Sequence, residues 1–327
     1  MKKFLIRRLV SGILVIWLVM TIVFILVHSV PGDPAQVIAG DLADVKTVEM
    51  IREKLGLNEP LWVQYCNLLK GMITGDIGNS FSYRYSAFKV VIDRIPATVE
   101  LTLVGACLAI PISIFLGIIS AVKRNSLLDH MAKLITLFGI STPSFWLGIM
   151  LILIFSVQLH WFPSMDKGPY YLPQAIWVAV NGNPEALWHW ARYIILPGIT
   201  LSAWFTALVA RMTRTETLDN LNRAFTLTAR SKGLGPVRVI IGHVLPNSLI
   251  PIITIAGIQI GILLGGALVT EAVFMWPGMG RLLMDSILAR DFPMIQATTM
   301  VYAIIWVGIN LLVDLIYVVI DPRLKLA

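Results

Sequence analysis

Long apolar runs alternate with polar segments along the whole of this 327-residue chain. The first run is uncharged from Leu9 to Val27, and about 20 residues with a rise of 1.5 Å each are enough to cross a bilayer. A cleaved signal peptide is the alternative for this run, but its apolar core is usually only about 7–15 residues long. With five later runs, the pattern predicts six transmembrane helices, over residues 9–27, 101–122, 134–157, 193–210, 249–270 and 297–320.

Proline, a residue that interrupts helices, occurs within these runs. Pro143 lies in the third run and Pro197 in the fourth. Membrane helices tolerate proline where neighbouring helices satisfy the freed backbone groups, so each run is predicted to remain one span. The fold class that follows is an all-α integral membrane protein.

The polar segment after the first run, residues 30–96, holds eight acidic and seven basic residues. Asp44 and Gly56 bracket one predicted helix, and Pro60 and Gly75 bracket a second. The apolar face of the first is Val48, Ile51 and Leu55, and that of the second is Leu61, Tyr65, Leu68 and Met72. Since the segment is too small for a catalytic domain and shows no repeat, we interpret it as a helical cap on the outer face of the membrane domain.

The distribution of basic residues predicts the orientation. Only 14% of the residues are charged, against about 25% in soluble domains, and the net charge is +7. A nucleic-acid-binding surface would gather this charge on one face, whereas here it is spread over loops between apolar runs. With the N-terminus inside, fifteen Lys and Arg fall on the inner side and four on the outer side, apart from the long insert. Short loops follow the positive-inside rule, so both termini are predicted to be cytoplasmic.

A basic segment from Arg211 to Pro246 is the longest polar interruption in the second half of the chain, with six basic and two acidic residues. We expect a helix, a break at Gly233, and a second helix that ends at Leu245 and Pro246, because glycine accepts the left-handed conformation that closes a helix. The segment is predicted to lie in the cytoplasm and to fit a partner's groove, with an ordinary amphipathic linker as the alternative. The predicted domains are residues 1–29, 30–96 and 97–327, the last containing the loop 211–246.

Motifs for catalysis are missing from the sequence. It has no GxxxxGK[ST] phosphate-binding loop, no HExxH metal motif and no GxSxG nucleophile motif, and its five histidines show no paired ligand spacing. We therefore predict that this chain has no catalytic residue, no metal site and no cofactor of its own.

Polar side chains inside the apolar runs are candidates for a translocation path. Asn310 and Asp314 are four residues apart and share a helix face, and an acid at mid-membrane costs about 2.5–3.5 kcal/mol on insertion scales. We expect Gln259 to lie deep in the bilayer, and Glu100 and Glu271 to lie at the outer ends of their spans, where water reaches them. A structural hydrogen bond to a neighbouring helix is the alternative role for Asp314.

Gly257, Gly261 and Gly265 recur every four residues and form one stripe. Small residues at this interval allow two helix backbones to approach closely. The stripe can be interpreted as a surface for helix packing or as a smooth wall of a translocation path. The path candidates are Gln259, Gly261, Glu271, Asn310 and Asp314.

Four short motifs follow one another along the chain. They are Pro31-Gly32-Asp33-Pro34, Gly75-Asp76-Ile77-Gly78-Asn79-Ser80, Glu271 with Trp276-Pro277-Gly278-Met279-Gly280, and Asp321-Pro322-Arg323. Pro and Gly set turn dihedrals, so turn formation is the alternative reason for them. Their order, spacing and the total length resemble the first permease subunit of ATP-binding-cassette importers of the dipeptide/oligopeptide/nickel family, over essentially the whole chain. The resemblance implies a type I importer permease fold with six transmembrane helices and a small helical extracytoplasmic insert.

The basic segment is similar to this family's cytoplasmic signature, which reads Glu-Ala-Ala, three residues, Gly, nine residues, Ile-x-Leu-Pro. With the glycine at Gly233, the sequence matches at Ala229, Leu245 and Pro246, and departs at the glutamate, the first alanine and the isoleucine. The resemblance implies that this segment couples the permease to ATPase subunits. The residues that it assigns to coupling are Ala224, Thr228, Ala229, Arg230, Lys232, Gly233, Leu234, Leu245 and Pro246.

The resemblance also implies partners and a location. A second, homologous permease subunit, two cytoplasmic ATP-binding subunits that hold ATP and magnesium, and an external solute-binding protein would complete the transporter in the cell membrane. The implied function is half of the pathway of a peptide importer, with nickel complexes and glutathione-type compounds as alternatives within the family. A secondary transporter is the remaining alternative, although it would show an internal repeat and paired ionisable residues at mid-membrane.

Overall fold

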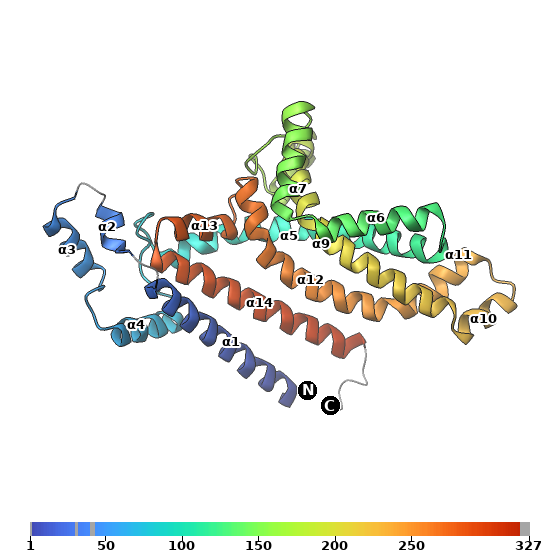
Figure 1. Ribbon diagram of the computed structural model, residues 1–327, viewed down its shortest axis with the longest axis horizontal. Helices are drawn as coiled ribbons and strands as arrows, with labels where there is room; N and C mark the ends of the chain where they lie inside the picture. Colours follow the sequence, from blue (N-terminus) through green and yellow to red (C-terminus); the bar gives the residue numbers. More distant parts are fainter. Residues whose placement is uncertain (1, 30–31, 40–42, 321–327) are drawn as a thin grey trace. The chain divides into compact units, whose positions relative to one another are not determined.

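The computed structural model describes residues 2–29, 32–39 and 43–320 (Figure 1). Pro31 and Asp321-Pro322-Arg323, from two of the motifs, lie outside these residues. Within the described ranges the chain forms helices and no strand, apart from one antiparallel bridge between Asn79 and Ser86. Two compact units divide it: residues 1–98 with 277–308, and residues 99–276 with 309–327. The predicted domains, residues 1–29, 30–96 and 97–327, are defined by where each lies relative to a membrane. They stay a prediction.

The first unit begins with one long helix and three shorter ones. They are α1 (Lys2–Ser29), α2 (Pro34–Ala39), α3 (Val45–Lys54) and α4 (Leu61–Thr74). The start of α5 (Ala87–Val122), α13 (Met279–Leu288) and most of α14 (Phe292–Ile320) complete this unit.

Local sequence rules place α3 and α4 correctly. The Asp44 side chain accepts a hydrogen bond from the Thr47 backbone at 3.1 Å and so caps the start of α3. Gly56 follows α3 with φ +67°, and Gly75 closes α4 with φ +75°, both in the left-handed region. The two helices predicted in the insert are therefore confirmed, while α2 was not predicted.

The apolar face of α4 packs on α1. Leu68 is buried together with Met20, Phe24 and Met300, and the Tyr65 hydroxyl lies 2.7 Å from the Thr21 hydroxyl. Helix α4 of the insert is thus anchored on the first apolar helix.

The glycine motif after α4 forms a turn and also makes a tertiary contact. Asp76 Oδ1 accepts a hydrogen bond from the Gly78 backbone at 3.1 Å, and Gly78 has φ +95°. Ser80 Oγ donates to Asp291 Oδ2 at 2.5 Å, and Asp291 Oδ1 accepts from the Met294 backbone in the first turn of α14. Ser80 therefore fastens this turn to the start of the last helix.

The second unit contains the remaining helices. They are the rest of α5, α6 (Leu127–Ser141), α7 (Ser144–Leu151), the π-helical segment η1 (Ile152–Gln158), α8 (Leu172–Val180), α9 (Glu185–Leu221), α10 (Ala224–Ser231), α11 (Pro236–Val239), the π-helical segment η2 (Ile240–Val244), α12 (Leu245–Val273) and the end of α14. Within this unit α9 packs against α6, α7, α8 and α12, so it is the helix around which the unit is built.

Within the part of the chain that the structure describes, five stretches are long and apolar enough to cross a membrane: Ile6–Ser29, Ala87–Val122, Glu185–Leu221, Pro236–Gly265 and Phe292–Leu315. A sixth span arises only if α6 and the α7–η1 helix are counted together, and these bend by 108°. Thr142 is extended at ψ 123°, because the residue before a proline avoids the helical region, and Pro143 then begins a new helix. The third run is therefore not one continuous helix, and the predicted six spans require this bent pair to count as one.

Pro197, in contrast to Pro143, does not interrupt its helix. It lies buried inside α9, which runs without a break for 37 residues. Just after it, a Cβ on Gly198 would lie only 3.1 Å from Val104 and 3.3 Å from Leu108, so α5 packs closely against α9 here. Tertiary packing thus holds this proline within a helix that extends well beyond the predicted ends at residues 193 and 210.

Candidate functional site

The predicted coupling residues form a basic hairpin, defined here as α10, α11 and the turn between them, residues 224–239. α10 ends at Ser231, and Gly233 follows with φ +79°. The Gly233 backbone donates to Arg230 O at 2.9 Å and the Leu234 backbone donates to Ala229 O at 3.4 Å, which satisfies carbonyls at the helix end. The expected glycine break at Gly233 is confirmed.

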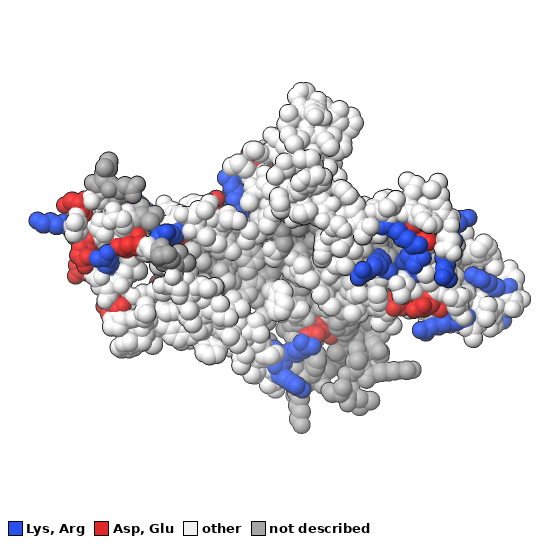
Figure 2. All heavy atoms as spheres, in the orientation of Figure 1, with Lys and Arg blue, Asp and Glu red and all other residues white. Residues whose placement is uncertain are grey.

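The hairpin has two unlike faces. Ala229 on α10 is buried with Val239 and Val244, and Leu221 and Leu234 pack against them. The opposite face exposes Ala224, Thr228, Arg230 and Lys232. Figure 2 shows Lys and Arg side chains gathered over the end of the second unit that carries α10 and α11. A buried, apolar underside therefore supports an exposed, basic upper face.

The second helix of the basic segment does not end at Leu245 and Pro246, so that prediction is wrong. α11 continues through η2 directly into α12, and Pro246 stands in the first turn of α12. Proline lacks a backbone N–H and its ring collides with the carbonyl four residues earlier in an α-helix. The wider π turn of η2 lies just before Pro246 and accommodates it.

A cluster of neutral polar side chains lies beneath the hairpin, which we call the Asn220 cluster: Thr217, Asn220, Thr226 and Ser248. Asn220 Nδ2 donates to Ser248 Oγ and to Glu216 O, both at 3.0 Å, and Thr226 Oγ1 donates to Asn220 O at 2.7 Å. All four cluster residues are at most 2% exposed. They join the end of α9 to the start of α10 and to α12.

A charged cluster, which we call the Asp129 cluster, lies beside an earlier turn of α9. It consists of Ser120, Asp129, Lys133 and Arg214. Asp129, fully buried near the start of α6, accepts from Ser120 Oγ at 2.5 Å, from Lys133 Nζ at 2.8 Å and from the Asn125 backbone at 3.0 Å. Arg214 Nε donates to the same carboxylate at 3.1 Å. The cluster ties the α5–α6 turn to α9, and sequence reasoning missed it, although the spacing from Ser126 to Asp129 is that of a helix cap.

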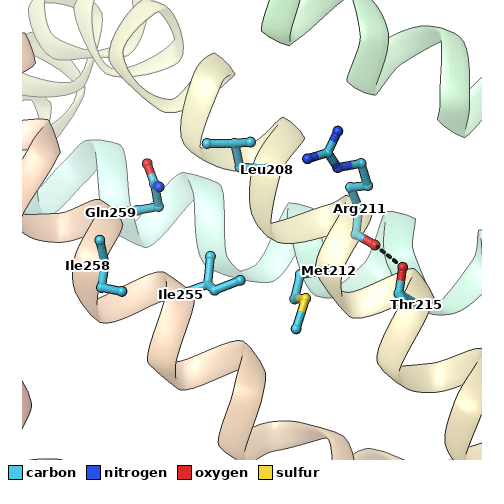
Figure 3. Close-up of a pocket in the computed structure, with 7 residues that line it drawn as sticks. All are labelled: Leu208, Arg211, Met212, Thr215, Ile255, Ile258 and Gln259. Atoms are coloured by element: carbon cyan, nitrogen blue, oxygen red, sulfur yellow. Dashed lines mark hydrogen bonds between the residues drawn. The ribbon is translucent and has the colours of Figure 1, made fainter.

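Among the predicted path residues, Gln259 lines a cavity of about 240 Å³ between α9 and α12 (Figure 3). Gly261, two residues further along α12, is also buried. A Cβ on Gly257 would lie 3.0 Å from Val313, as expected for close helix packing, while a Cβ on Gly265 would meet no described atom within 4 Å. Asn310 and Asp314 are half-buried on α14. The assignment of these residues to a path stays a prediction.

The expectation that water reaches Glu100 and Glu271 is wrong, because Glu100 is 9% exposed and Glu271 is fully buried. Glu100 Oε1 accepts from the Leu172 backbone at 2.5 Å and from Trp190 Nε1 at 3.0 Å, so the carboxylate ties α8 and α9 to α5. In the loop before α8, burial lowers the pKa of the Lys167 ammonium, against the opposing effect of the Glu100 charge.

Comparisons with known proteins identify the class. Residues 113–326 match the family described as binding-protein-dependent transport system inner membrane component, and residues 1–102 match the N-terminal part of such membrane components. The chain belongs to this family, and it is a multi-pass, all-α transmembrane permease.

Two curated relatives extend along the whole chain. The dipeptide transport system permease protein DppB of Alkalihalophilus pseudofirmus is 40% identical over 99% of this chain and 100% of its own length. The glutathione transport system permease protein GsiC of Escherichia coli (strain K12) is 38% identical over 99% of each chain. A chain of the inward-facing MetNI methionine ABC transporter has a similar fold, with a TM-score of 0.56 at 18% identity, over 71% of this chain and 96% of that one. The predicted family is confirmed.

Proposed function

We propose that this chain is the first permease subunit of an ATP-driven importer of short peptides. The relative at 40% identity is named as a dipeptide permease, and glutathione, named in the other relative, is itself a short γ-linked peptide. The observation that carries the proposal is the basic hairpin. Its buried underside at Ala229, Val239 and Val244 holds an exposed upper face in a fixed position.

The proposed transporter contains a second, homologous permease subunit, two cytoplasmic ATP-binding subunits and an external solute-binding protein. ATP and magnesium belong to the ATP-binding subunits, and this chain contributes no catalytic group and no cofactor site. Both termini and the basic hairpin lie in the cytoplasm, as the excess of basic residues in the short loops supports.

The proposed mechanism is mechanical. Closure of the ATP-binding subunits pushes on the exposed residues Ala224, Thr228, Arg230 and Lys232, and the hairpin moves with α9 and α12. Gly233 permits the tight turn, Leu234 packs beneath it, and Leu245 and Pro246 begin the helix that receives the push. Arg230 and Lys232 are suited to pair with acidic groups on the ATPase surface because both are exposed.

A glutathione-type or nickel-complex importer is the alternative within the family. The described residues hold no group of three or more His, Cys, Asp or Glu arranged as a metal site, which favours peptides over nickel. A secondary transporter is the more distant alternative, and it would need no ATPase subunit.

Labelling and purification test the proposal. Ser231 is exposed on α10, and the native Cys66 and Cys107 are exposed as well. In a chain with Cys66→Ser and Cys107→Ser, Ser231→Cys in intact cells should react with membrane-permeant maleimide only. Purification of the chain should bring ATP-binding subunits with it. Reaction of the cysteine with an impermeant reagent, or a chain purified without any ATPase, would contradict the mechanism.

Substitutions of Gly233 separate backbone strain from contact with a partner. A Cβ at Gly233 meets no described atom within 4 Å, so the hairpin itself has room for a side chain. Gly233→Asn should retain uptake, because asparagine tolerates the left-handed region at a cost below about 1 kcal/mol. Gly233→Trp should leave ATP hydrolysis running while uptake falls at least about tenfold, the effect of roughly 1.4 kcal/mol in coupling. Normal uptake and assembly with Gly233→Trp would overturn the proposed push.

A further inference from the structure

The cavity between α9 and α12 has walls of mixed chemistry (Figure 3). Its volume of about 240 Å³ is large enough to hold several water molecules or a small ligand group. Its lining residues are Leu208, Arg211, Met212 and Thr215 on α9, and Ile255, Ile258 and Gln259 on α12.

Gln259 is the buried polar group of the cavity. It is 8% exposed, and no hydrogen bond to its side-chain amide is found among the described residues. Its amide therefore keeps hydrogen-bonding capacity for a molecule in the cavity. One group can satisfy both its oxygen and its nitrogen: a peptide bond, which offers a donor and an acceptor side by side.

Arg211 lies on the α9 side of the same cavity (Figure 3). Its side chain is exposed, and it forms no ion pair with any acid in the described part of the chain. The guanidinium presents a planar fork of donors that matches a carboxylate, and it is always charged. Leu208 and Ile255 lie between Arg211 and Gln259, and Ile258 adds a further apolar side chain to the lining, so an anion at Arg211 would have an apolar wall beside it.

We propose that this cavity is a subsite for the carboxyl-terminal end of a short peptide as it passes through the permease. Arg211 binds the terminal carboxylate, Gln259 hydrogen-bonds the last peptide bond, and the apolar wall receives the last side chain. This inference rests on the proposed function and deepens it by naming the part of the substrate that the permease itself contacts. A lipid phosphate is the other source of an anion for Arg211, and the experiment must separate the two.

The test uses a small photoreactive dipeptide on the transporter assembled from the full chain and its partner subunits. Alanyl-photoleucine with a free carboxylate, and the same dipeptide with a carboxyl-terminal amide, are irradiated with the complex in nanodiscs. The external binding protein is left out, so that its own preference does not enter. Mass spectrometry then locates the label, which we expect within residues 208–215 or 255–259.

Three variants assign the roles. The dipeptide with a free carboxylate should label the permease at least about tenfold more than its amide. This is the effect of losing one hydrogen bond to a charged group. Arg211→Gln should remove this preference, Arg211→Lys should keep part of it, and Gln259→Leu should weaken labelling by acid and amide alike. Arg223→Gln is the matched control, because Arg223 is exposed and lies outside the cavity. Equal yields of each complex show that the variants fold.

Label found only outside these segments, or equal labelling by acid and amide in the unaltered chain, overturns the subsite. Labelling that is suppressed by exchanging neutral nanodisc lipids for phosphatidylglycerol shows that a lipid phosphate occupies Arg211, and also overturns it. Uptake of radiolabelled dipeptide into proteoliposomes with the binding protein present is measured in parallel. A complex that transports peptide without the acid preference refutes this inference alone, whereas a complex that transports no peptide refutes the proposed function.

Discussion

The Asp129 cluster and the Asn220 cluster both hold the same end of α9, but with opposite chemistry. In the first, one buried carboxylate is surrounded by donors from Ser120, Lys133, Arg214 and a backbone amide. In the second, Asn220 Oδ1 and Thr217 Oγ1 are buried and have no hydrogen-bond partner among the described residues. Unsatisfied groups contribute little hydrogen-bond energy in their present position. The Asn220 cluster should therefore resist displacement less than the Asp129 cluster. The comparison indicates that α9 is fixed at Arg214 and yields beyond it, next to the basic hairpin.

Removing the charge of Asp129 should have the largest effect. Asp129→Asn leaves the Arg214 guanidinium without its counter-ion, and breaking a buried pair from one side typically costs about 3–5 kcal/mol. The thermal midpoint of the assembled complex should fall strongly. Lys133→Gln is the control, because its side chain is 47% exposed and surface pairs contribute at most about 1 kcal/mol. Equal effects of the two variants would show that the cluster is no fixed anchor.

Asn220→Ala should have an intermediate effect that falls mainly on coupling. It removes the bonds from Nδ2 to Ser248 Oγ and to Glu216 O, at a cost of about 1–2 kcal/mol. Uptake per ATP hydrolysed, measured in proteoliposomes, should fall more than the amount of assembled complex. Asn222→Ala is the matched control, because the Asn222 side chain is exposed and donates to Leu218 O of its own helix. A similar loss of uptake in both variants would remove the special role of Asn220.

Thr217→Val should have the smallest effect, and of opposite sign. Valine has nearly the same shape and deletes a buried hydroxyl without a described partner, so stability should stay level or rise by up to about 1 kcal/mol. Thr213→Val, one turn earlier, deletes a hydroxyl that donates to Val209 O at 2.8 Å and should cost about 0.5–1 kcal/mol. Thermal midpoints of the two complexes compare them directly. If Thr217→Val destabilises more than Thr213→Val, the Asn220 cluster is not the more easily displaced of the two.

Local rules account for the features that the sequence predicts well. Asp44, Gly56, Gly75 and Gly233 act through their own dihedrals and nearest hydrogen bonds, so the ends of α3, α4 and α10 follow from a few neighbouring residues. The apolar runs fix the candidate spans for the same reason, because hydropathy is a property of each segment alone.

Long-range contacts explain the failures. Glu100 seemed accessible from its place in the sequence, yet Trp190, ninety residues away, covers and binds it. Pro143 and Pro197 look alike in sequence, but close packing of α5 beside Gly198 is seen only at the second. Asp129 and Arg214 are 85 residues apart, and Asn220 and Ser248 are 28 apart, so neither cluster could be read from spacing.

Because of the π turn at Ile240–Val244, the number of residues between Gly233 and Pro246 sets the direction in which the basic hairpin points. A π turn contains one more residue than the α turns around it, and each residue of an α-helix advances the chain by about 100°. Deleting one residue within η2 would therefore swing the basic face of the hairpin about a quarter of the way round the axis of α12. The direction in which that face points depends on the number of residues in η2, so a change of length here re-aims the face even when every contacting side chain is kept.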